Sequence, residues 1–127
     1  MSCEFIDRIR DEIGRDEGAS KDLLRSIDEE LQRDPSAELW ILRGDAIQLS
    51  DGEGYELDDA EISYWNAIQR DPYSAAAYES LGHFTYAVKD NARASLQFFR
   101  KALSLGAGPS AHEGLRDAED EIQELGF

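Results

Sequence analysis

Apolar residues recur along most of this chain at intervals of three and four positions, the spacing that places side chains on one face of an α-helix. Seven such stripes occur, and short polar segments containing proline, glycine or serine separate them. Residues that favour β-strands are scarce, and the whole chain contains one valine. The pattern therefore predicts an all-α fold of seven helices.

Several helix ends are predicted from residues that cap helices. Ser36 and Ser74 each come just after a proline and are expected N-caps. Two further pairs have the spacing of a capping box, in which side chains three positions apart satisfy each other's backbone N–H groups. These pairs are Asp58 with Glu61 and Ser110 with Glu113. The other expected caps are Ser20, Gly14, Gly106 and Gly126.

The sequence also repeats itself. Gln-Arg-Asp-Pro occurs at residues 32–35 and again at 69–72. After each copy come a stretch of serine and alanine, an aromatic residue, and a glycine four positions beyond the aromatic residue. The two instances are Trp40 with Gly44 and Tyr78 with Gly82. Because a helical stripe lies on each side of the break that follows, the repeated unit is predicted to be a pair of helices.

The spacing of these residues resembles the tetratricopeptide repeat. The first copy reads Trp40-x-x-x-Gly44-x-x-Ile47, then Ala60-x-x-x-Tyr64-x-x-Ala67, and ends at Asp71-Pro72. The second copy reads Tyr78-x-x-Leu81-Gly82-x-x-Thr85, then Ser95-x-x-x-Phe99-x-x-Ala102. Small residues let helix backbones approach, and we expect the large residues Trp40, Tyr64, Tyr78 and Phe99 to fill the space between helices.

The resemblance implies one domain over residues 1–127, a right-handed α-solenoid of about three helix pairs followed by a C-terminal capping helix. Residues 37–74 and 75–109 match well, whereas residues 2–36 match in the second helix and its Asp-Pro exit. Residues 110–127 resemble the extra helix that covers the last repeat. Two departures from the family pattern are Arg43, where leucine is usual, and Ser95, where alanine is usual.

The resemblance also implies a binding surface, because the first helix of each pair lines the concave inner wall that commonly holds a peptide in this family. Carried over residue by residue, one unit contributes Glu38, Ile41, Asp45, Gln48 and Leu49. The next unit contributes Ala76, Glu79, His83, Tyr86 and Ala87. The alternative is that these are the faces left over after packing. Ile41, Leu49 and Tyr86 favour a binding surface, since they are apolar groups that packing does not need.

Charge restricts the partner. Twenty-eight acidic residues face thirteen lysines and arginines, which gives a formal net charge of −15. Such a surface repels nucleic acid and anionic membranes. The expected partner is another protein or peptide with lysine or arginine flanking an apolar anchor, although a salt-adapted host would explain the same acidity. Members of the family that clamp acidic tails use lysines and asparagines where this chain has Ile41, Asp45, Glu79, Ser80 and His83, so we expect acidic tails not to bind.

Residues 51–61 read DGEGYELDDAE and partly fit the calcium loop of an EF-hand. The centre fits, but Leu49 and Ala60 stand where the first and last ligands belong. A calcium-binding helix-loop-helix protein is therefore a less favoured alternative, with only weak cation attraction at the acidic cluster. That cluster consists of Asp51, Glu53, Glu56, Asp58 and Asp59.

We find no motif for catalysis, a cofactor or a metal. His83 and His112 lie on different predicted helices, and Cys3 is the only cysteine, so no zinc-ligand spacing exists. With no signal sequence and no apolar run that could span a bilayer, the expected location is the cytoplasm.

A second functional alternative is a homodimer, because the final helix carries an apolar seam that could pair with another copy. This seam consists of Leu115, Ala118, Ile122 and Leu125.

Overall fold

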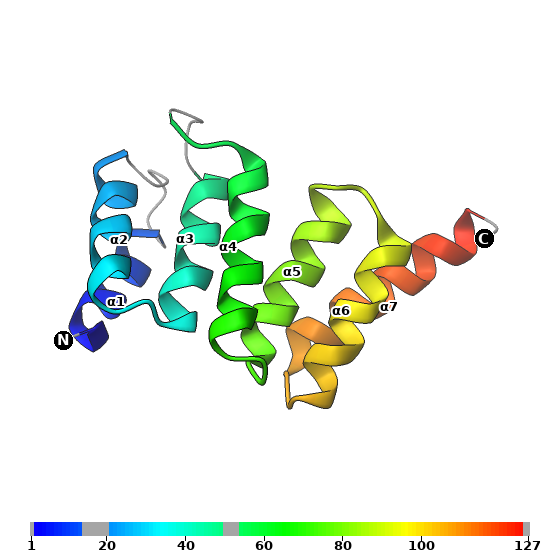
Figure 1. Cartoon of the computed structure of the whole chain (residues 1–127). Coiled ribbons are helices and arrows are strands. Elements are labelled where there is room, and N and C mark those ends of the chain that lie inside the picture. Colours follow the sequence, from blue (N-terminus) through cyan, green and yellow to red (C-terminus); the bar gives the residue numbers. More distant parts are fainter. Residues whose placement is uncertain (1, 14–20, 50–53, 126–127) are drawn as a thin grey trace. The chain divides into compact units, whose positions relative to one another are not determined.

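Figure 1 shows the computed structural model of the chain, which describes residues 2–13, 21–49 and 54–125. The regular elements in these residues are seven α-helices, and no strand occurs among them, so the all-α prediction and the helix count are confirmed. None of these helices combines the length and apolar character that crossing a membrane requires. The helices are α1 (Ser2–Ile13), α2 (Lys21–Arg33), α3 (Ala37–Leu49), α4 (Leu57–Arg70), α5 (Ala75–Ala87), α6 (Ala92–Ser104) and α7 (Pro109–Glu124).

Three of the predicted helix caps are confirmed. The Ser36 hydroxyl oxygen accepts a hydrogen bond from a backbone N–H of α3 at 3.2 Å, and Ser74 does the same for α5 at 3.1 Å. Gly106 follows α6 with φ +99°, a conformation that favours glycine. The backbone N–H groups of Gly106 and Ala107 then donate to the carbonyl oxygens of Leu103 and Ala102, which is the Schellman arrangement.

Both predicted capping boxes are wrong. Helix α4 begins at Leu57, two residues earlier than an Asp58 cap would allow, and the Asp59 carboxylate accepts the backbone N–H of Glu56 at 2.9 Å. Helix α7 begins at Pro109, whose fixed φ suits the first helical position, so Ser110 is already inside the helix. The expected caps Ser20, Gly14 and Gly126 lie outside the described residues.

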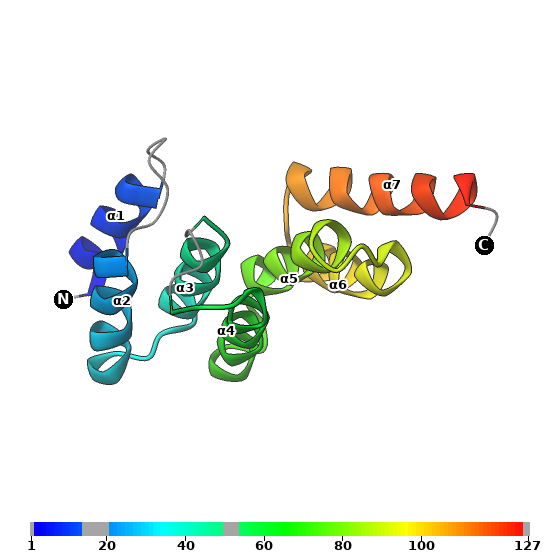
Figure 2. The same ribbon diagram turned by 90° about the horizontal axis from the view of Figure 1, so that it is seen from above.

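The chain divides into two compact units, Met1–Asp71 and Pro72–Phe127, and each is described by itself. In the first unit α3 packs against α4, and both α1 and α2 pack against α3, which lies between α2 and α4 in Figure 1. In the second unit α5 pairs with α6, and α7 packs on α6 and also contacts α5, as Figure 2 shows. This packing of adjacent helices is consistent with a helical repeat.

In each unit an aromatic ring packs directly on glycine. Tyr64 of α4 is fully buried, and a Cβ atom at Gly44 of α3 would lie 2.5 Å from its ring. Phe99 of α6 is also fully buried, and Cβ atoms at Gly82 of α5 and Gly114 of α7 would lie 2.8 and 2.5 Å from its ring. The prediction that small residues admit large ones between paired helices is confirmed at both rings.

The other two large residues do not fill the core. Trp40 and Tyr78 are only half-buried, and the core beside them is formed by aliphatic residues such as Leu39 and Leu81. The Trp40 ring lies 5.8 Å from the Arg43 guanidinium carbon, and the Tyr78 ring lies 6.0 Å from the Lys101 ammonium nitrogen. Both rings therefore cover the edge of the core and present a face to a cation.

Arg43 links three helices of the first unit. Its Nε atom lies 2.7 Å from the Asp28 carboxylate of α2, and its guanidinium donates to the Ser63 hydroxyl of α4 at 2.7 Å. The Tyr55 hydroxyl donates to the same carboxylate at 2.5 Å, and its ring lies 5.4 Å from the guanidinium. With 15% of its side chain exposed, Arg43 is a paired, mostly buried cation and not a surface substitution for leucine.

Candidate functional site

The expected wall residues of the first unit share helix α3 but differ in exposure. Leu49 is 48% exposed, whereas Ile41 and Asp45 are half-buried. Glu38 and Gln48 are exposed, and the Glu38 carboxylate pairs with a guanidinium of α1. Helix α3 therefore offers apolar surface near its C-terminal end, while α1 occupies its N-terminal end.

Two of these wall residues hold the buried Tyr64 ring in place. The Tyr64 hydroxyl donates to the Asp45 carboxylate at 2.6 Å, and the Gln48 side-chain amide donates to that hydroxyl at 2.6 Å. Burial raises the pKa of the Asp45 carboxyl above its ordinary 3.8, and the hydrogen bond from Tyr64 opposes this rise. Burial and the adjacent carboxylate also raise the pKa of Tyr64. Asp45 and Gln48 thus have a structural role that the sequence did not indicate.

The half-buried Asp45 carboxylate predicts a pH-dependent stability. Because its pKa is raised in the folded state, its contribution to stability is greatest below 3.8 and is lost as the pH rises through the higher folded value. We expect Asp45→Asn, which keeps an acceptor for the Tyr64 hydroxyl, to be more stable than the wild type at neutral pH. The gain should shrink as the pH falls. Urea unfolding of both proteins from neutral to acidic pH measures this gain in stability. A variant that is less stable than the wild type at neutral pH would show that the Asp45 charge is favourable.

Of the expected wall residues of α5, His83 contacts α7. His83 Nε2 is 3.1 Å from the Ser110 hydroxyl oxygen of α7, and the His83 ring packs edge-on to Phe99 with a centroid distance of 4.9 Å. Glu79 approaches the same histidine nitrogen at 3.9 Å. Helix α7 therefore adjoins α5 at His83 and forms part of the surface on this side of α5. Two further expected residues, Ala76 and Ala87, are exposed.

The charges of several acidic side chains act on the Tyr86 hydroxyl. Tyr86 is half-buried near the end of α5, and partial burial together with the charges of Glu121, Asp117, Glu124 and Asp90 raises the pKa of its hydroxyl. Three of these carboxylates belong to α7, and the fourth belongs to the turn between α5 and α6. Helix α7 thus supplies most of the negative field at the tyrosine that was expected on the wall.

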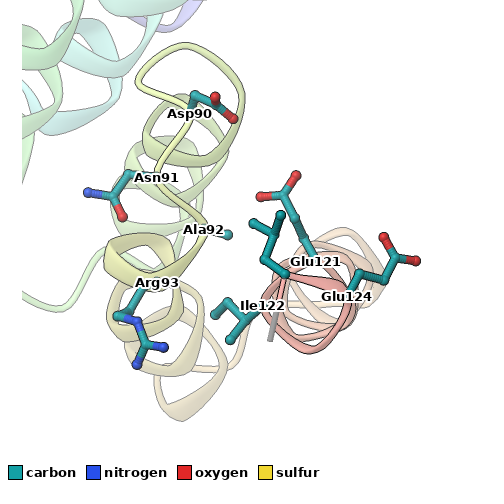
Figure 3. A pocket seen from close by; sticks show the side chains of 8 residues that line it. Asp90, Asn91, Ala92, Arg93, Glu121, Ile122 and Glu124 are labelled. Carbon is teal, nitrogen blue, oxygen red and sulfur yellow. The ribbon is translucent and has the colours of Figure 1, made fainter. Parts of the chain in front are cut away.

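A groove of about 540 Å³ lies between the start of α6 and the end of α7. Figure 3 shows Ala92 and Ile122 pointing into the gap between the two helices, with Glu121 on the side of Asp90 and Arg93 at the opposite end. Ala92 is buried, Ile122 is half-buried and Leu125 is 60% exposed. The groove therefore has an apolar floor and a largely acidic border. Its lining residues are Asp90, Asn91, Ala92, Arg93, Glu121, Ile122, Glu124 and Leu125.

Sequence reasoning did not predict this groove, although the apolar seam of the last helix was its signal. Ala118 and Ala111 are fully buried and Gly114 is buried on the same helix, so this part of α7 packs against its own unit. Farther along, Ile122 is only half-buried and Leu125 is largely exposed. The first part of the seam therefore covers α6, and the last part of the seam lines the open groove.

The acidic stretch at 51–61 falls partly outside the described residues, which exclude Asp51 and Glu53. Of the remainder, Asp59 caps α4, and Ala60 is fully buried, as helix packing requires. Among the described residues, no group of three or more histidine, cysteine, aspartate or glutamate side chains is placed to hold a metal ion. His112, one of the two histidines, is exposed on α7.

Comparison of the chain with protein-family models and with curated proteins gives no match. The likeness to the tetratricopeptide repeat therefore rests on the residues and spacings of the sequence.

Proposed function

We propose that this chain is a non-catalytic helical-repeat module, similar to the tetratricopeptide repeat, which binds a segment of another protein. The observation that carries the proposal is the open groove between α6 and α7, with its apolar floor and acidic border. An apolar side chain can be desolvated on Ile122 and Leu125, and a lysine or arginine beside it complements the nearby carboxylates. The module thus fits a basic segment with an apolar anchor.

The charge of α7 supports a basic partner. The helix carries one arginine, Arg116, against six acidic residues. Because the whole chain is also strongly negative, at −15, its field attracts a cationic segment from a distance and repels an acidic one. The six acidic residues are Glu113, Asp117, Glu119, Asp120, Glu121 and Glu124.

Self-association through α7 is the alternative, and the structure gives two reasons to favour a basic partner. A symmetric pairing would bring the acidic helix against a copy of itself, and like charges would oppose it. Ala118, near the middle of the seam, is also fully buried in its own unit and has no surface to offer a second copy. A basic segment at the groove meets neither obstacle.

The proposal includes no reaction and no cofactor. Two of the tyrosines with raised pKa values have their hydroxyl groups in hydrogen bonds that hold the fold together. Burial and the Asp28 carboxylate raise the pKa of Tyr55 to about 12, and Tyr64 is bound by Asp45 and Gln48. Neither hydroxyl is poised for proton transfer near neutral pH.

A selection from random peptides tests this function. The full chain is immobilised and challenged with a phage-displayed library of random peptides of about 12 residues, long enough to cover one groove. We expect the enriched peptides to combine lysine or arginine with a large apolar residue. Their affinity should fall as sodium chloride is raised from about 0.05 to about 0.5 M, because salt screens the attraction.

An acidic peptide with a free C-terminal carboxylate serves as the control ligand and should not bind. The proposal would be wrong if no peptide is enriched over the bare support. It would also be wrong if the enriched peptides lack cationic residues, or if their binding does not respond to salt.

A further inference from the structure

Helix α4 of the first unit carries a stripe of side chains that complements itself when it is reversed. Its members recur at every fourth position, so they form one continuous ridge on the helix surface. In chain order the ridge is acidic, apolar, amide and basic, and its residues are Asp58, Ile62, Asn66 and Arg70. Asp58 and Arg70 are exposed, and Ile62 is 53% exposed. Covering this isoleucine would remove apolar surface from water.

A hollow of about 510 Å³ lies beside this ridge, between α2 and α4. Figure 1 shows these two helices on either side of α3, and residues of all three helices line the hollow. Ile62 and Asn66 of the ridge belong to this lining. Leu31 of α2 and the half-buried Trp40 of α3 supply further apolar surface. The hollow can therefore receive an apolar side chain from another molecule.

The charged residues that line the hollow already have partners. Arg43 and Asp28 form an ion pair at 2.7 Å. Asp59 accepts the backbone N–H of Glu56 at the start of α4, where the helix dipole favours an acidic side chain. The hollow therefore lacks the excess of carboxylates that opposes a symmetric pairing through α7.

We propose that the chain forms a two-fold symmetric homodimer in which the α4 ridges of two copies lie side by side and run in opposite directions. The reversal places Asp58 against Arg70 of the second copy, because both residues lie six positions from the middle of the ridge. Ile62 of the second copy meets Asn66 and enters the hollow. Each contact occurs twice, as two-fold symmetry requires. Ridges of this spacing form the commonest class of helix packing, with axes that cross at about 50°.

A second copy fits this face better than an unrelated protein does. The order of charged and apolar side chains that complements the ridge is the same order read backwards, and every copy of the chain carries it. The dimer leaves the α6–α7 groove unused, so it goes beyond the proposed binding of a peptide and does not depend on it.

The net charge determines the conditions in which the dimer forms. Two chains of −15 each repel one another, and the screening length of this repulsion falls from about 30 Å at 0.01 M salt to about 8 Å at 0.15 M. Exposed ion pairs contribute little, so the screening of the repulsion dominates. Dimerisation should therefore strengthen over this range of sodium chloride, whereas peptide binding at the groove weakens with salt.

Sedimentation velocity of the full chain tests the dimer at about 0.15 M sodium chloride and at about 1 µM to about 1 mM protein, the range of weak to moderate affinity. We expect Ile62→Glu to raise the dissociation constant of the dimer at least about tenfold, because it places an unpaired carboxylate in both hollows. Leu57→Glu and Leu125→Glu change the net charge by the same amount and should have little effect. Leu57 lies about 140° around α4 from Ile62, and Leu125 lies on the α6–α7 groove.

Exchange of the ridge charges gives a sharper test. Arg70→Glu changes the net charge to −17 and Asp58→Arg changes it to −13, yet each should weaken the dimer about tenfold, because like charges then meet at two places. The double variant keeps −15 and restores opposite charges, so its dissociation constant should return to within about threefold of the wild type. If net charge alone controlled association, Asp58→Arg would strengthen the dimer and overturn the proposal.

The remaining outcomes separate this interface from the alternatives. Circular dichroism verifies that each variant is folded, and Ile62→Glu should still bind the peptides obtained from the selection. A chain that stays monomeric at the highest concentration would overturn the dimer. A dimer that persists in Ile62→Glu but dissociates in Leu125→Glu would place the interface on α7 and also overturn it. Neither result affects the proposed binding of a peptide.

Discussion

Replacing Phe99 with alanine is expected to lower the free energy of unfolding by about 3–5 kcal/mol, the usual range for a buried phenylalanine. The ring is fully buried and packs against Gly82 of α5 and Gly114 of α7. Because both neighbours are glycines, no side chain at these positions can move into the space that the ring leaves. The cavity would lie where all three helices of the second unit meet. Urea unfolding followed by far-UV circular dichroism measures the loss.

The adjacent Phe98 gives a matched control for this measurement. It is half-buried on the same helix, so Phe98→Ala should cost clearly less. The two tryptophans, Trp40 and Trp65, both belong to the first unit, so their fluorescence reports that unit alone. If the second unit unfolds independently in Phe99→Ala, the dichroism transition will shift while the fluorescence transition does not. Equal losses at the two phenylalanines would contradict the central role of the Phe99 ring.

The helices and the packing of aromatic rings on glycines could be predicted because both produce short-range patterns in the sequence. Periodicity identifies a helical face, and the repeated spacing places Gly44 and Gly82 opposite the aromatic residues Tyr64 and Phe99. The contact of Gly114 with Phe99 was not predicted. The sequence predicts that the last helix covers the repeats, but its pattern occurs once, so no repeated spacing indicates how closely it approaches Phe99.

Helical periodicity and repeated spacing could not predict how deeply each side chain is buried, or which residues far apart in the sequence pair with each other. Trp40 has helical spacing, but periodicity indicates a direction and not how far the core extends, and the residue is half-buried. Arg43 stands where the tetratricopeptide repeat, which the sequence resembles, usually has leucine. Its partners are Asp28, on the preceding helix, and Tyr55, in the following loop, and their convergence depends on how the helices pack.

In the candidate site, too, the sequence predicts some features and does not predict others. The sequence placed Asp45 and Gln48 on an accessible face, but whether their polar atoms are free depends on the Tyr64 hydroxyl of another helix. The groove depends on where α7 lies against α6. In the sequence, α7 shows only an apolar seam among acidic residues, and the packing decides which part of that seam is buried and which part is open.

Gly44→Ala is expected to destabilise the first unit by about 1–3 kcal/mol, as overpacking of a core does. Helix propensity alone predicts the opposite, because alanine inside a helix is favoured over glycine by roughly 0.5–1 kcal/mol. The new Cβ atom would lie 2.5 Å from Cε1 and 2.7 Å from Cζ of Tyr64. The ring cannot turn aside easily, since its hydroxyl is bound by Asp45 and by Gln48 at 2.6 Å each. The clash should therefore outweigh the propensity.

A double-mutant cycle with Tyr64→Leu separates the two effects. If the clash is the cause, Gly44→Ala should cost less, or become stabilising, once the ring is gone, and the two changes will not add. Gln69→Ala, an exposed position of α4, should change stability by less than about 0.5 kcal/mol. A Gly44→Ala protein as stable as the wild type would mean that α3 and α4 can separate at little cost. The contact between glycine and ring would then not be what sets the distance between these helices.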